Sequence, residues 1–359
     1  MARPPRKPAD PGPAETPPPG RRHRSRGGMT LSELAQIAGV SPMSASRALN
    51  APALVSPAIL AKVQAAVAST GYVANRVAGG LASRRSRLVA AVLPSLAGSV
   101  FEPMVQSLFV ALAQSDYQLL LGQSGYGVQQ DHRFLEALIG RRPDGLVLCG
   151  VVPSAEGARQ LAAARLPVVE TWDMVASPID MVVGFSHESI ARAVAEHLLR
   201  HGHRQFAFVG GDHERARRRG KAFASAIQAG GKSRNEPVSI VLETAPTPGT
   251  VRGGREALRR ILARQPKTSA VFCSSDMLAL GMVTEAQARG IAVPGQIAIV
   301  GFGDASFSAD IRPALTTVRV DSEAIGRKAA HCIVERAEGR EVANAVVDVG
   351  FSLIVRETA

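Results

Sequence analysis

The sequence predicts an α/β protein in which a small helix-turn-helix domain precedes two lobes built on parallel sheets. Three observations lead to this fold class. A helix, a glycine turn and a second helix are indicated within residues 30–50. Positive charge is concentrated in the first quarter of the chain. From Leu88 onwards, short apolar strands alternate with helices in two consecutive series.

The helix-turn-helix pattern has both its start and its stop signals. Thr30 can cap a first helix with an apolar face, and Gly39 is placed to end it. Ser41 and Pro42 then start a second helix, whose inward face carries Ala45, Ala48 and Leu49. Its outward face carries short polar side chains and a cationic one, which suits a helix that enters a DNA major groove. Many helical segments that never touch nucleic acid share this pattern, so the motif alone stays a hypothesis.

Charge and length indicate that the N-terminal part of the chain has a different binding partner from the rest. Residues 1–87 hold 13 Lys and Arg against three acids, which accounts for ten of the 12 net positive charges. This asymmetry favours a polyanionic partner for the N-terminal part of the chain. The length of 359 residues allows two or three domains. Residues 1–28 are rich in Pro, Gly and Arg and lack an apolar run, which predicts a disordered basic tail rather than a secretory signal.

A third helix, started by Ser56 and Pro57 and stopped by Gly71, completes a three-helix domain over residues 29–74. Asn75–Ala82 can form a short fourth helix. Gly79 and Gly80 each cost about 1 kcal/mol of helix propensity, so this helix needs a partner to form. Residues 75–87 are accordingly expected to be a hinge helix and linker.

The remainder, residues 88–359, reads as two similar lobes. Lobe 1 is expected at about 88–185 plus 319–340, and lobe 2 at about 186–318 plus 341–359. The expected strands span 88–94, 117–123, 144–150, 166–172 and 181–185, then 205–211, 239–245, 269–275 and 297–303, and the tail adds a helix at 321–338 and one strand at 346–357.

In such sheets a ligand binds at the carboxyl ends of the strands, here in the cleft between the lobes. The glycine turns at those ends complete no dinucleotide fingerprint, so we expect no nucleotide cofactor. The three cysteines fit no metal spacing and read as buried reduced thiols, and no nucleophile–base pair is evident, so we expect neither a metal nor an enzyme.

The order of segments resembles the LacI/GalR family of bacterial transcription regulators over about residues 29–359. The segments that carry this resemblance are LSELAQIAGVSPMSASRALN, GYVANRVA, PDGLVLCG, HLLRHGHRQFAFVGG, FCSSDMLALG and IAIVGFGD. Within the family, PVVETWDMVASPIDMVVGFSH is most similar to the gluconate-utilisation repressors. The resemblance implies a periplasmic-binding-protein-like effector domain behind the DNA-binding domain.

For DNA, the resemblance implies base reading by the start of the second helix and by an arginine further along it. The hinge helix would insert a leucine wedge into the minor groove. Pro42 has no side-chain donor, so direct readout should fall mainly on Arg47. The implied DNA-contacting residues are Pro42, Met43, Ser44, Ser46, Arg47, Asn50, Tyr72, Asn75, Ala78 and Leu81.

For the effector, the resemblance implies an anchoring arginine three residues before Gly220, which is Arg217. Gly303 replaces the family's sugar-binding Asp, a change that favours an acidic ligand. Asp276 is expected to cap the helix that follows it rather than to bind ligand. His213 is expected near the pocket at best. The implied effector-contacting residues are Ser95, Phe101, Trp172, Arg217, Ser275 and Asp304.

Together these features predict a cytoplasmic, homodimeric repressor of sugar-acid metabolism that binds a palindromic operator. Gluconate or a related sugar acid in the cleft would set its operator affinity. No cofactor, metal or membrane is expected. A solute-binding protein, which has the same lobes, and a regulator of a neutral sugar are the alternatives; the helix-turn-helix and the lack of a signal peptide oppose the first.

Overall fold

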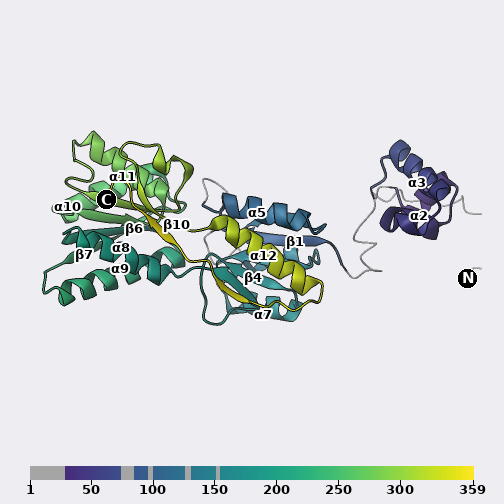
Figure 1. Cartoon of the computed structure of the whole chain (residues 1–359), viewed down its shortest axis with the longest axis horizontal. Coiled ribbons are helices and arrows are strands. Elements are labelled where there is room, and N and C mark those ends of the chain that lie inside the picture. The colour runs from purple at the N-terminus through teal and green to yellow at the C-terminus, as the bar shows by residue number, and fades with distance from the viewer. Residues whose placement is uncertain (1–28, 74–84, 96–99, 126–130, 151–153) are drawn as a thin grey trace, which may run out of the picture. The chain divides into compact units, whose positions relative to one another are not determined.

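The computed structural model describes residues 29–73, 85–95, 100–125, 131–150 and 154–359 (Figure 1). The chain forms two compact units, residues 1–83 and 84–359. The predicted contacts of Asn75, Ala78 and Leu81 lie outside the described residues, as do the expected tail and hinge helix. No helix within the described ranges is long and apolar enough to cross a membrane.

The first unit is the predicted three-helix domain. Thr30 and Glu33 form a reciprocal capping box at the start of the first helix, which ends at Gly39 with φ of 63°. Ser41 and Ser56 cap the next two α-helices, each with a proline at its first position. The core is small and rich in alanine around Leu34 and Val63. The elements are α1 (Leu31–Ala38), α2 (Pro42–Asn50), the 3₁₀ turn η1 (Pro52–Leu54) and α3 (Pro57–Thr70).

Lobe 1 of the second unit is a six-stranded parallel sheet in the order β11-β5-β4-β3-β1-β2. Helices α5 and α12 lie side by side on this lobe (Figure 1). Its elements are β1 (Leu88–Leu93), α5 (Glu102–Ala113), β2 (Gln118–Gln123), α6 (Asp131–Ile139), β3 (Gly145–Cys149), α7 (Ala155–Ala164), β4 (Val168–Thr171), β5 (Met181–Gly184), α12 (Ser322–Ala337) and β11 (Val346–Asp348).

Lobe 2 repeats the same strand order, β12-β10-β9-β8-β6-β7, and only β12 runs antiparallel to its neighbour. Helices α8 and α9 cover one face of this sheet, and α10 and α11 cover the other (Figure 1). Its elements are α8 (His187–Arg200), β6 (Gln205–Gly211), α9 (Glu214–Ser233), β7 (Ser239–Ala245), α10 (Val251–Arg264), β8 (Ala270–Cys273), α11 (Asp276–Ala288), β9 (Ala298–Phe302), the 3₁₀ turn η2 (Ser306–Ala309), β10 (Thr316–Arg319) and β12 (Ser352–Ile354).

The predicted alternation of strands and helices is confirmed, and the tail needs two corrections. The expected strand 346–357 is two strands, because Gly350, at φ of 69°, turns the chain between them. Its first half pairs with β5 of lobe 1, and its second half pairs with β10 of lobe 2. Residues 346–348 therefore belong to the sheet of lobe 1, not of lobe 2. Strand β10 was not expected at all.

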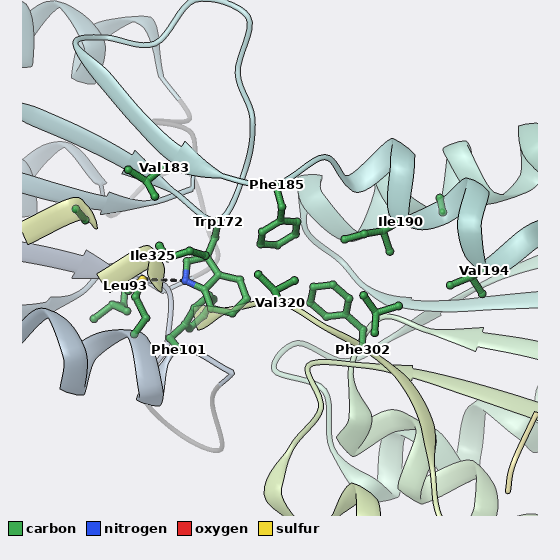
Figure 2. Close-up of a cluster of buried hydrophobic side chains, with 14 of the residues drawn as sticks. Leu93, Phe101, Trp172, Val183, Phe185, Ile190, Val194, Phe302, Val320 and Ile325 are labelled. Atoms are coloured by element: carbon green, nitrogen blue, oxygen red, sulfur yellow. Dashed lines mark hydrogen bonds between the residues drawn. The ribbon is translucent and has the colours of Figure 1, made fainter. Parts of the chain in front are cut away.

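The chain crosses between the lobes three times, after β5, after β10 and after β11. Aromatic side chains fill the seam where these crossings meet. Trp172 contacts Phe101 and Phe185 edge-on, at centroid distances of 4.8 and 5.7 Å, and Phe185 contacts Phe302 at 6.0 Å (Figure 2). One hydrophobic cluster therefore runs through both lobes.

Candidate functional site

A cavity of about 590 Å³ lies at the carboxyl ends of the strands and is lined by residues of both lobes. Lobe 1 contributes the start of α5 and Trp172. Lobe 2 contributes the loops and helix starts that follow β6, β8 and β9. This is the position at which open parallel sheets bind their ligands.

Four of the expected effector residues line this cavity: Phe101, Trp172, Ser275 and Asp304. Trp172 is held rigidly, because it is 3% exposed and its indole Nε1 donates to the Met104 sulfur at 2.9 Å. Phe101 packs against its ring at the seam (Figure 2). These two aromatic residues form an apolar part of the cavity lining, and their contact with an effector stays a prediction.

Ser95, the fifth expected residue, is buried at the end of β1 and is not among the described residues that line the cavity.

Arg217 does not occupy the position expected of it. Its side chain is half exposed and forms ion pairs with Asp212 at 2.6 Å and Glu214 at 3.4 Å, outside the lining residues. Arg215 and Arg219 line the cavity instead. The buried stripe of α9 explains the difference: it includes Ala216, Arg219, Gly220, Phe223 and Ile227. These positions share one helix face, which excludes residue 217.

Arg219 is the most unusual side chain of the site. It is 3% exposed and its guanidinium carbon lies 3.7 Å from the centre of the Phe302 ring. Its Nε and Nη1 have no hydrogen-bond partner within the part of the chain that the structure describes. Burial, together with the nearby charge of Arg215, lowers the pKa of Arg219 to about 9. A buried cation with free donors is costly to keep, so it is a candidate ligand anchor.

Arg215 also reaches across the seam. Its guanidinium lies 5.5 Å from the Phe101 ring centre, and its Nη1 is 3.8 Å from the Cys149 sulfur, both in lobe 1. Arg218, which lies outside the cavity lining, makes a second connection. It pairs with Asp173 of lobe 1 at 2.9 Å and donates to the Met174 carbonyl at 3.2 Å. Helix α9 is therefore attached to the loop that follows β4.

The acids around the cavity are already engaged. Asp304 pairs with Arg319 at 2.5 Å and Arg356 at 2.8 Å, so its carboxylate is committed to neighbouring arginines rather than left for an effector. Glu102 lines the cavity but is exposed. The buried or half-buried charges of the lining that have no carboxylate partner among the described residues are therefore those of Arg215 and Arg219, while Glu102 places one negative charge at the exposed side.

Asp276 is not the cap that the sequence suggested. Ser275 caps α11, accepting from the Leu278 amide. The Asp276 carboxylate is buried and accepts from the Thr317 hydroxyl (2.6 Å), the Ala305 amide (2.7 Å) and the Ser308 hydroxyl (3.0 Å). It therefore braces the loop between β9 and η2 against β10.

Two histidines also line the cavity: His213, which the sequence placed near the pocket at best, and His187, which the sequence did not single out. His213 caps α9 through Nδ1, which accepts from the Ala216 amide, and burial lowers its pKa to about 3. His187 is 1% exposed. Burial, followed by the charge of Arg219, holds the pKa of His187 well below its usual value. Both rings are neutral near pH 7.

The described residues contain no cluster of three or more side chains suited to holding a metal. Cys149, Cys273 and Cys332 are all free thiols, and Cys149 is only half buried.

On the helical unit, the expected DNA-contacting residues lie on α2, except Tyr72, which follows α3. Pro42, Met43, Arg47 and Asn50 are exposed, and Ser44, Ser46 and Tyr72 are half buried. Asn50 donates to the Ser46 carbonyl at 3.0 Å, which fixes its side chain along the helix. Arg47 makes no ion pair with any described residue, so its guanidinium is available.

Comparison with known proteins agrees with this architecture. Residues 30–75 match the model of bacterial regulatory proteins of the lacI family, and residues 195–359 match a periplasmic binding protein-like domain. The HTH-type transcriptional regulator GntR of Pseudomonas aeruginosa is 36% identical over 336 residues, which cover 93% of this chain and 97% of that protein. The chain belongs to the LacI family.

GntR of Escherichia coli K12 is 30% identical, over 90% of this chain and 96% of that protein. Among solved structures, a LacI-family regulator from Silicibacter pomeroyi superimposes with a TM-score of 0.84 at 30% identity, covering 92% of this chain and 99% of that one. GntR from Chromobacterium violaceum gives a TM-score of 0.70 at 34% identity, covering 76% and 98%. As a LacI-family member, the chain is a DNA-binding transcription regulator with an effector-binding domain, not an enzyme.

The state of Arg219 predicts that it destabilises the unliganded protein. Replacing it by methionine, Arg219→Met, keeps much of its volume and removes an unpaired buried charge, so the free energy of unfolding should rise by about 1–2 kcal/mol. Urea unfolding followed by the fluorescence of Trp172 measures this at the seam. A loss of stability in the variant would show that Arg219 is already satisfied in the free protein.

Proposed function

We propose that this LacI-family regulator is a repressor of sugar-acid metabolism whose operator affinity is set by gluconate or a related sugar acid in the cavity. The observation that carries the proposal is Arg219, a buried cation whose Nε and Nη1 have no partner among the described residues. A guanidinium can donate two parallel hydrogen bonds to the two oxygens of a carboxylate.

The surroundings of Arg219 favour an anion over a neutral sugar. Arg215 adds a second positive charge to the lining, while Asp276 and Asp304 have their carboxylates engaged elsewhere. A neutral sugar would leave both cations without a counter-charge. The similarity to regulators named GntR supports the same ligand class.

The change in operator affinity on ligand binding would act through the contact between the two lobes. A ligand in this cavity touches both lobes, and Arg215 and Arg218 already reach from α9 to lobe 1. Ligand binding would therefore bias how the lobes meet. We propose that this bias alters the spacing of the paired hinge segments and with it the affinity for the operator.

We also propose that the regulator acts as a homodimer on a palindromic operator. Phe109 and Val110 on α5, Leu121 on the edge strand β2 and Leu242 on the edge strand β7 are large apolar side chains that the single chain leaves at least 40% exposed. A second copy would bury them and cover both sheet edges.

The anchor is tested by calorimetry with gluconate on the full chain. Arg219→Met should weaken binding about 100-fold, because it removes charge-assisted hydrogen bonds worth about 3 kcal/mol. Arg217→Met is the matched control, since Arg217 lies on the same helix but is paired outside the cavity, and it should bind gluconate as the wild type does. The reverse ranking of the two variants would overturn the anchor assignment.

The DNA surface is tested by selecting operators from a random pool of DNA duplexes. Arg47→Ala should relax the base preference at one position of each half-site, because a bidentate arginine contact contributes about 1–3 kcal/mol of discrimination. Lys62→Ala, an exposed cation on α3, serves as the control and should leave the selected sequence unchanged. A uniform loss of affinity in Arg47→Ala, with the same selected sequence, would make Arg47 a phosphate contact instead.

A further inference from the structure

His187 is a second cavity residue whose hydrogen bonding is incomplete. It stands at the first position of α8, is 1% exposed, and is part of the cavity lining. Neither Nδ1 nor Nε2 makes a hydrogen bond of good geometry within the described ranges, and the Trp172 backbone is the one hydrogen-bonding group that interacts with the ring and raises its pKa. An unpaired buried nitrogen costs about 1–3 kcal/mol, so the free protein retains a polar ring that it does not itself satisfy.

The ring is fixed in place by aromatic contacts. It packs edge-on against Phe185 at a centroid distance of 5.0 Å. Phe185 packs against Phe302 (Figure 2). The Arg219 guanidinium lies over the Phe302 ring. A chain of ring contacts thus connects His187 to Arg219, and both side chains line the same cavity.

The protonation state of His187 restricts what it can bind. The arginines that face it are Arg219 and Arg215 in the lining and Arg218 beside it, and together with burial they lower its pKa. A neutral imidazole offers one N–H donor and one lone pair. A carboxylate can only accept, so it would use the N–H and leave the lone pair unused, and a cationic group would meet three arginines. A hydroxyl group both donates and accepts, so it suits either nitrogen.

We propose that His187 is a specificity-determining residue that hydrogen-bonds a hydroxyl group of the effector. The site would then select polyhydroxy acids over acids that lack hydroxyl groups. This inference rests on the proposed function, namely on an acid anchored at Arg219.

The test compares gluconate with its deoxygenated analogues by calorimetry on the full chain. His187→Leu should bind gluconate about tenfold more weakly, and His187→Gln, which keeps a donor and an acceptor, no more than about threefold more weakly. One deoxygluconate, lacking the contacted hydroxyl, should bind the wild type and His187→Leu equally well. His201→Gln is the matched control, because His201 is exposed at the other end of the same helix.

Three results would contradict the inference while leaving the anchor intact. One is an unchanged gluconate affinity in His187→Leu. Another is an equal loss for gluconate and every deoxygluconate, which would mark His187 as a structural residue. The third is binding of hexanoate, a six-carbon acid without hydroxyl groups, as tightly as gluconate by the wild type. If His187→Leu does not fold, the glutamine variant and the analogue series on the wild type still decide the question. Failure of every sugar acid to bind the wild type would instead overturn the proposed function itself.

Discussion

The organisation of the cavity depends on a buried charge that has no ion-pair partner among the described residues, the guanidinium of Arg219. A protein normally pairs such a group or excludes it from the interior. Here the neighbouring acids make other contacts: Asp304 binds two arginines and Asp276 braces a loop. The guanidinium carbon lies 3.7 Å from the centre of the Phe302 ring. The free protein thus holds a buried cation without an ion-pair partner among the described residues, as the proposed anion site requires.

The position of this charge matters because of how the lobes are joined. Three chain crossings and a continuous aromatic seam make the lobes one unit, while Arg215 and Arg218 reach from α9 of lobe 2 to lobe 1. A ligand bound to α9 therefore acts on a helix that already contacts both lobes. This arrangement gives a binding event at the cavity a physical route to the arrangement of the lobes, which is what a ligand-controlled DNA-binding protein requires.

Much of the fold could be predicted from local patterns, because the caps of helices and the apolar strands of four to seven residues are each formed by residues that are adjacent in the sequence. The tail could not, since the partners of β11 and β12 lie far away in the chain and Gly350 alone marks the turn between them. In the site, counting back from Gly220 selected Arg217, whereas the buried stripe through Ala216 and Phe223 would have selected Arg219. The sequence around His187 did not indicate that it is buried. Its burial depends on Phe185 and on the chain crossings between the lobes, which come together only in the folded protein.

The central claim is that this cavity selects an anion rather than a neutral sugar. The most direct measurement is the thermal unfolding of the full chain with gluconate, and with glucose or sorbitol as neutral ligands of similar size. A ligand that binds only the native state raises the melting temperature, and a hundredfold excess over Kd adds about 2.7 kcal/mol of stability. The account predicts a rise of several degrees with gluconate and none with the neutral ligands. A rise with glucose or sorbitol but not with gluconate would contradict it.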